Sequence, residues 1–167
     1  MGNDPDLRVR SKRFGSVEVP TAVIGYLRRY CQRLGTHETG GALGGYFRKY
    51  GILVISHVMP PSPRNKAGWF WLKRHRGDAQ TFVNSVFVDT QGAANYVGEW
   101  HTHPEPHPSP SAYDFKMLTD LLKRSKLEIG FLVGIIVGDT GEICLWLQDA
   151  AGNREIFPAA VPECGPH

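Results

Sequence analysis

Cysteine is scarce in this sequence, with three in 167 residues. Cys31, Cys144 and Cys164 lie far apart and form no C-x-x-C pair. The sequence therefore predicts neither a disulfide framework nor a cysteine-based zinc site. Any metal ion must be held by histidines and carboxylates, and we expect Cys31 and Cys144 to be small core residues.

The chain also lacks a long apolar run and a strong charge. Its longest apolar run, residues 129–137, is too short to span a bilayer, and its first residues lack the apolar stretch of a secretory signal. We therefore expect a cytoplasmic protein with no membrane partner. The net charge is +3 and the basic residues are scattered. We expect no nucleic-acid partner, because a concentrated basic stripe is missing.

What is present fits one globular domain. Hydrophobic residues make up 41% and charged residues 21% of the chain, near the averages for soluble proteins. We expect an irregular N-terminal segment over 1–18, a single domain over 19–158 and a C-terminal tail over 159–167. The length is sufficient for a buried core.

The hydrophobic pattern predicts an alternation of helices and strands. Pro20 can open a helix that runs to about Leu34 and ends at Gly35. Residues 62–93 read as a polar, loop-rich insertion that contains a strand over 69–72 and a helix over 78–88. Outside the insertion we expect strands over 42–48, 52–58, 95–101, 131–137 and 143–147, a proline loop over 104–110 and a helix over 111–126. This order favours the α+β class, with a mixed central sheet flanked by helices.

The informative stretch runs from Gly98 to Asp114. His101 and His103 alternate on a predicted strand, so they point to the same face with Cα atoms about 6.6 Å apart. Two imidazoles placed in this way can converge on one zinc ion, and a catalytic zinc site takes three protein ligands and a water. Asp114 is the natural third ligand, because the proline loop returns the chain and Ser111 can cap the helix that carries it.

Each of these residues also has a purely structural interpretation. A His-x-His pair on a strand can be a surface or core pair, and Ser111-x-x-Asp114 is a variant of the helix capping box. A hydrolase needs a general base besides its metal ligands. Glu38 is the best upstream candidate, and the alternative for it is an exposed charge. Gly40 and Gly41 follow it and allow close backbone approach.

Taken together, Glu38, His101-Thr102-His103, Ser111 and Asp114 resemble the JAMM motif of MPN-domain metalloproteases, and the predicted elements resemble their fold over about 19–148. The resemblance implies an MPN fold with a cytidine-deaminase-like arrangement. It also implies that His101, His103 and Asp114 bind one zinc ion per chain, that Glu38 relays the proton of the attacking water, and that Ser111 stabilises the oxyanion.

Two further polar residues of the motif region remain open. Glu99 shares the predicted face of the two histidines, so it is either a partner of a ligand histidine or a salt-bridged or exposed strand residue. We expect His107, in the proline loop, to be exposed.

The resemblance further implies hydrolysis of a peptide or isopeptide bond of a ubiquitin-like modifier. The short motif and single domain are similar to the prokaryotic branch, some of whose members accompany E1- and E2-like proteins in antiphage conjugation systems. A sulfur-carrier processing peptidase and a noncatalytic MPN-type scaffold are the alternatives. Trp69, Phe70 and Trp71 either offer an exposed edge to the tail of a conjugate or belong to the core.

Overall fold

The computed structural model describes residues 7–32 and 35–159. Its main feature is one eight-stranded mixed sheet in the order β1-β2-β4-β3-β7-β8-β9-β10. The strands of this sheet are β1 (Leu7–Ser11), β2 (Gly15–Val19), β3 (Gly40–Arg48), β4 (Ile52–Val58), β7 (Asn95–Thr102), β8 (Phe131–Val137), β9 (Ile143–Asp149) and β10 (Arg154–Ala159). The pairs β2–β4 and β7–β8 are parallel, and the other neighbours are antiparallel.

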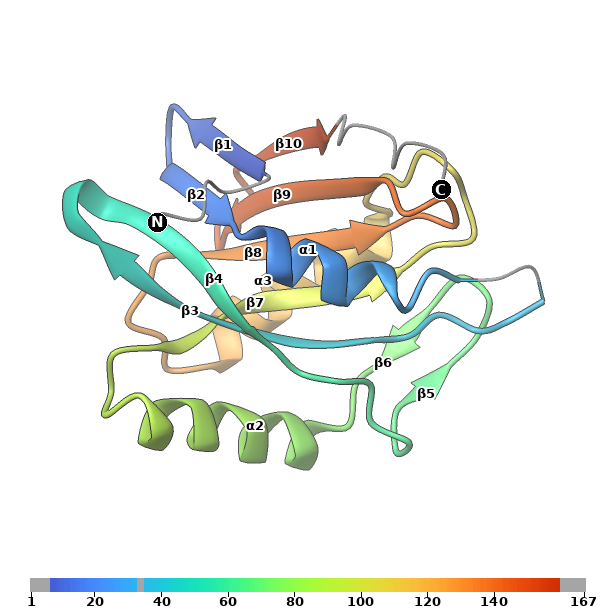
Figure 1. Ribbon diagram of the computed structural model, residues 1–167, viewed down its shortest axis with the longest axis horizontal. Helices are drawn as coiled ribbons and strands as arrows, with labels where there is room; N and C mark the ends of the chain where they lie inside the picture. Colours follow the sequence, from blue (N-terminus) through green and yellow to red (C-terminus); the bar gives the residue numbers. More distant parts are fainter. Residues whose placement is uncertain (1–6, 33–34, 160–167) are drawn as a thin grey trace.

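Helices cover both faces of the sheet (Figure 1). Helix α1 (Thr21–Arg28) packs on one face, where Ile24 and Leu27 join the larger core cluster with Trp100. Helices α2 (Arg76–Asp89) and α3 (Ala112–Arg124) pack on the other face, where each forms a smaller cluster that includes Tyr96. The α+β class with a mixed sheet and flanking helices is as predicted, and the likeness to cytidine deaminases stays a prediction.

The sheet is strongly curved, so that its first and last strands approach each other (Figure 1). The Ser11 hydroxyl donates to Glu155 at 2.7 Å, and Arg13 lies 3.3 Å from Asp149. Valines of β1 and β2 share the larger core cluster with residues of β8 and β9. The curvature therefore encloses one apolar core under α1.

The expected irregular segment over 1–18 is wrong for the part that the structure describes. Strands β1 and β2 pair from Leu7↔Val19 to Ser11↔Gly15, and Val9 and Val17 are buried. Apolar and charged residues alternate here with the period of two that is typical of a half-buried strand. At the other end, β10 was not expected either, and residues 160–167 of the predicted tail lie outside the described residues.

The first helix is shorter than predicted. Helix α1 ends at Arg28 instead of continuing to Leu34, which lies outside the described residues. The remaining predicted pattern is confirmed for the hairpin of β3 and β4 and for β7, α3, β8 and β9. None of the helices in the described ranges is long and apolar enough to cross a bilayer.

The insertion holds a small hairpin and α2. Strands β5 (Lys66–Ala67) and β6 (Leu72–Lys73) form a separate two-stranded sheet. The predicted strand over 69–72 is therefore wrong except at Leu72, because residues 68–71 form the hairpin tip, with the Gly68 N–H donating to the Trp71 carbonyl at 2.9 Å. Trp69, Phe70 and Trp71 are exposed rather than part of the core.

Candidate metal centre

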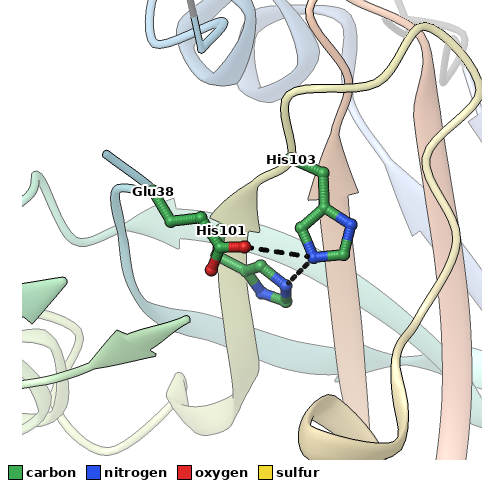
Figure 2. Close-up of side chains that lie close together, drawn as sticks. All are labelled: Glu38, His101 and His103. Atoms are coloured by element: carbon green, nitrogen blue, oxygen red, sulfur yellow. Dashed lines mark hydrogen bonds and ion pairs between the residues drawn. The ribbon is translucent and has the colours of Figure 1, made fainter. Parts of the chain in front are cut away.

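The two histidines lie at the carboxyl end of β7. His101 is in the strand and His103 follows directly after it. Their Nε2 atoms are 3.1 Å apart, and Figure 2 shows the two rings turned toward one another. The edge of the Trp146 ring lies against His101, with ring centroids 6.2 Å apart. The predicted convergence of the two imidazoles is confirmed.

The proline loop brings the start of α3 to the same place. Asp114 Oδ1 lies 3.1 Å from His101 Nε2, and Asp114 Oδ2 lies 3.5 Å from His103 Nε2. Ser111 and Asp114 also form a capping box: the Ser111 N–H donates to Asp114 Oδ2 at 2.7 Å, and the Ser111 hydroxyl accepts from the Asp114 N–H at 3.2 Å. The Ser111 hydroxyl also donates to Asp114 Oδ2 at 2.8 Å. The structural interpretation of these two residues is therefore confirmed, and the same cap fixes the carboxylate that faces the histidines. Their functional roles stay a prediction.

Glu38 reaches the site from the segment before β3. Its Oε1 lies 3.6 Å from His103 Nε2 (Figure 2), and only 5% of the residue is exposed. The Glu38 N–H donates to the Gly68 carbonyl of the insertion at 2.8 Å, and the Thr102 N–H donates to the Thr39 carbonyl at 2.9 Å. The interpretation of Glu38 as an exposed charge is wrong, because the segment that carries it is anchored on both sides.

Gly40 makes this close approach possible. A Cβ atom at this position would lie 2.1 Å from the Trp100 carbonyl oxygen and 2.8 Å from the Cβ of His101. Only glycine leaves room for β3 to begin beside the histidine strand at this distance. The expected role of this glycine is therefore confirmed.

The donor atoms fit a tetrahedral metal ion. Ligand distances of about 2.0–2.1 Å place neighbouring ligand atoms about 3.3 Å apart in a tetrahedral site. The two Nε2 atoms are 3.1 Å apart, Asp114 Oδ1 lies 3.1 Å from that of His101, and the other oxygen, Oδ2, lies 3.5 Å from that of His103. Glu38, His101 and His103 also form a group that could hold a metal ion, with ligand atoms within 4.8 Å of one another. Two carboxylates thus face the two imidazoles.

The environment gives the two carboxylates different protonation behaviour. Burial raises the pKa of Glu38 to about 7; the charge of His103 opposes this shift and that of Asp114 adds to it. Burial also disfavours the Asp114 anion, but hydrogen bonds from His101 and His103 outweigh it and hold the pKa well below its usual range. Asp114 is therefore ionised, as a metal ligand must be, while a carboxyl group that titrates near neutrality can accept and release a proton.

Glu105 is a site residue that the sequence analysis missed. Its Oε1 lies 2.9 Å from His103 Nδ1, on the opposite side of the ring from Asp114. A carboxylate on the second ring nitrogen fixes the orientation of a ligand histidine. Glu105 stands two residues after His103, so it continues the alternation of His101 and His103, and this alternation could have indicated its position near the histidines.

Glu99 and His107 lie outside the cluster. Glu99 is buried, forms an ion pair with Arg74 at 2.7 Å and accepts a hydrogen bond from the Tyr96 hydroxyl at 2.7 Å. Of the two interpretations of Glu99, the salt-bridged strand residue is confirmed. His107 is exposed, as expected, and pairs with Glu142.

Comparisons with known proteins place this geometry in a family. The chain is 39% identical over 103 residues to a "CD-NTase/cGAS isopeptidase" of Escherichia coli, a match that covers 60% of this chain and 64% of the relative. It is 37% identical over 96 residues to a protein of the same name from Vibrio cholerae, covering 58% and 59% of the two chains. The chain thus matches less than two thirds of the length of these relatives.

A solved structure agrees with the fold. The solution structure of a protein from Desulfitobacterium hafniense superposes with a TM-score of 0.55 at 14% identity, and the match covers 84% of this chain and 89% of the other. At this identity the likeness concerns the fold alone. Residues 20–148 match the family described as prokaryotic homologs of the JAB domain, and the chain belongs to this family.

Proposed function

We propose that the protein is a zinc-dependent hydrolase of peptide or isopeptide bonds. One observation carries the proposal: two imidazoles and an ionised aspartate meet at tetrahedral spacing beside a second, buried carboxylate. In this proposal His101, His103 and Asp114 hold one zinc ion per chain, and Glu38 lies close to them without being a ligand. Zinc lowers the pKa of water toward neutrality and polarises a carbonyl group.

The protein's own side chains then account for the proton transfers. Glu38 takes a proton from the water whose oxygen attacks the amide carbon. It returns that proton to the nitrogen as the C–N bond breaks, which leaves a carboxylic acid and an amine; the acid then gives its proton to the amine. In this proposal the Ser111 hydroxyl, at the start of α3, donates to the developing negative charge on the carbonyl oxygen, and the loss of such a donor typically costs about 10²–10³ in rate.

For the substrate we propose a protein conjugated through an isopeptide bond, with a ubiquitin-like modifier as the conjugate. The relatives named isopeptidases support this class of bond. E1- and E2-like proteins are then the expected partners, in an antiphage conjugation system. Trp69, Phe70 and Trp71 are exposed at the tip of the hairpin whose Gly68 carbonyl accepts from Glu38, which suits contact with a conjugate tail.

The test separates metal binding from turnover. Wild type, Glu38→Gln and His101→Ala are purified, and their zinc content is measured by mass spectrometry. Cleavage is measured on a branched peptide with a Gly-Gly tail linked to a lysine side chain. We expect Glu38→Gln to keep zinc and to lose turnover at least about 10²-fold. We expect His101→Ala to lose both. Normal turnover in Glu38→Gln would contradict the mechanism.

The same experiment distinguishes the alternative functions. A noncatalytic scaffold would show no cleavage by the wild type even with zinc bound. A sulfur-carrier processing peptidase would cleave a linear peptide amide after Gly-Gly but would leave the branched isopeptide intact. Glu38, the two histidines and Asp114 are buried together, and Ser111 caps the helix that carries Asp114; this complete set supports an enzyme over a scaffold.

A further inference from the structure

A large cleft lies between α2 and α3, away from the metal centre. Its volume is about 930 Å³, and its floor includes Asn95 and Tyr96 at the start of β7. His101 lies six residues after Asn95 and five after Tyr96 on the same strand, about 17–20 Å at ~3.3 Å per residue, and none of the residues of the cluster lines the cleft. The cleft is therefore distinct from the cluster that holds the proposed zinc ion.

The walls of the cleft are apolar. Val83 and Phe87 line it from α2, Met117 and Leu121 from α3, and Leu127 from the segment after α3. Helix α2 buries only Ala79 and Val86, while Phe87 is 48% and Val88 is 70% exposed. An apolar stripe on a helix normally packs against another element. No element in the described part of the chain covers this stripe.

The rim of the cleft is basic. Five cationic residues line the cleft and no acidic residue does; they are Lys73, Arg74, Arg76, Arg124 and Lys126. The carboxylate of Glu99 neutralises Arg74. A hydrogen bond from Lys116 lowers the pKa of Asp120, and the charge of the nearby Arg124 helps to lower it. Lys73, Arg76 and Lys126 form no ion pair with any described residue. The cleft thus offers uncompensated positive charge around an apolar centre.

We propose that this cleft binds an acidic amphipathic helix of a partner protein. Charge complementarity selects the acidic polar face, and the apolar walls select side chains at positions i, i+3, i+4 and i+7 of a helix. An extended peptide cannot add to the floor as a strand, because β7 is already paired with β3 on one side and β8 on the other. A third helix laid on the sheet between α2 and α3 covers the exposed stripe.

The test uses a designed peptide of about 18 residues, which forms about five helical turns. It carries leucines on one face and glutamates on the other, and a scrambled peptide of the same composition is its control. Binding to the full chain is measured by fluorescence anisotropy. The variant Arg76→Glu/Lys126→Glu reverses two charges of the basic rim, and Arg10→Glu/Lys49→Glu reverses two exposed charges that do not line the cleft.

We expect the amphipathic peptide to bind at least about tenfold more tightly than the scrambled one. The cleft variant should weaken this binding about tenfold, and the control variant should leave it within about twofold. Val83→Asp, which places a charge on the apolar wall, should abolish it while the far-UV spectrum stays unchanged. Equal binding of the two peptides would overturn the proposal. Competition would also overturn it, if a single-stranded oligonucleotide or dodecanoate displaced the amphipathic peptide at a lower concentration than the scrambled peptide needs to displace it.

Discussion

The ring of His103 is held from both sides. Its Nδ1 lies 2.9 Å from Glu105 while its Nε2 faces Asp114 and His101. Loss of a carboxylate that orients a ligand histidine typically costs 10–100-fold in metal affinity. We therefore expect Glu105→Ala to weaken zinc binding about tenfold or more, measured by competition with a chromophoric chelator. Glu142→Ala is the matched control, because Glu142 pairs with the exposed His107. Equal affinities in Glu105→Ala and wild type would rule out this role.

For single residues, the sequence predicts the members of a local motif better than the side chains that pack or pair around the motif. His101, His103 and Asp114 lie close in sequence, so strand alternation and a capped helix are enough to bring them together. Arg74 and Trp146 approach the motif only through the tertiary fold. Arg74 depends on how the insertion folds back on β7, and Trp146 depends on the register of β9 with β8. Neither arrangement leaves a signal in the local pattern.

The insertion is fastened to the histidine strand by one buried ion pair. Arg74 follows β6, and its Nε lies 2.7 Å from Glu99 on β7; their side chains are 15% and 4% exposed. Removing one partner of such a pair leaves a buried charge uncompensated and typically costs 3–5 kcal/mol. We expect Arg74→Met to lower the free energy of unfolding by about 3 kcal/mol, measured by urea denaturation.

The double variant Arg74→Met/Glu99→Leu tests the physical reason. Replacing both partners of a buried pair by apolar side chains is often neutral, so this variant should recover most of the lost stability. The Tyr96 hydroxyl then loses its acceptor, which costs about 1 kcal/mol. A double variant as unstable as Arg74→Met would show that packing of the arginine side chain, and not the unpaired charge of Glu99, sets the stability of this connection.

The sequence predicts the central strands of the sheet but not the strands at its two ends. The hairpin of β3 and β4 and the strand β8 have local signals, namely a short turn and a continuous apolar run. Strands β1 and β10 stand at the two edges and β2 lies next to β1, and the parallel pairing of β2 with β4 joins residues far apart in the chain. The period of two marks β1 and β2 as strands, but local periodicity does not show which strands they pair with, because that depends on the complete sheet.

A metal ion held by His101, His103 and Asp114 would tie together two parts of the molecule, the end of β7 and the first turn of α3. An ion that binds only the folded state stabilises it by about 2.7 kcal/mol at a concentration of 100 times its Kd. For a chain of this length each kcal/mol raises Tm by about 2–4 °C. We therefore expect zinc to raise the Tm of the chelator-treated protein by about 5–10 °C in calorimetry. His101→Ala should show no such rise, because it lacks a ligand. A comparable rise in His101→Ala would mean that zinc binds elsewhere on the chain, and the cluster would then not be the metal centre.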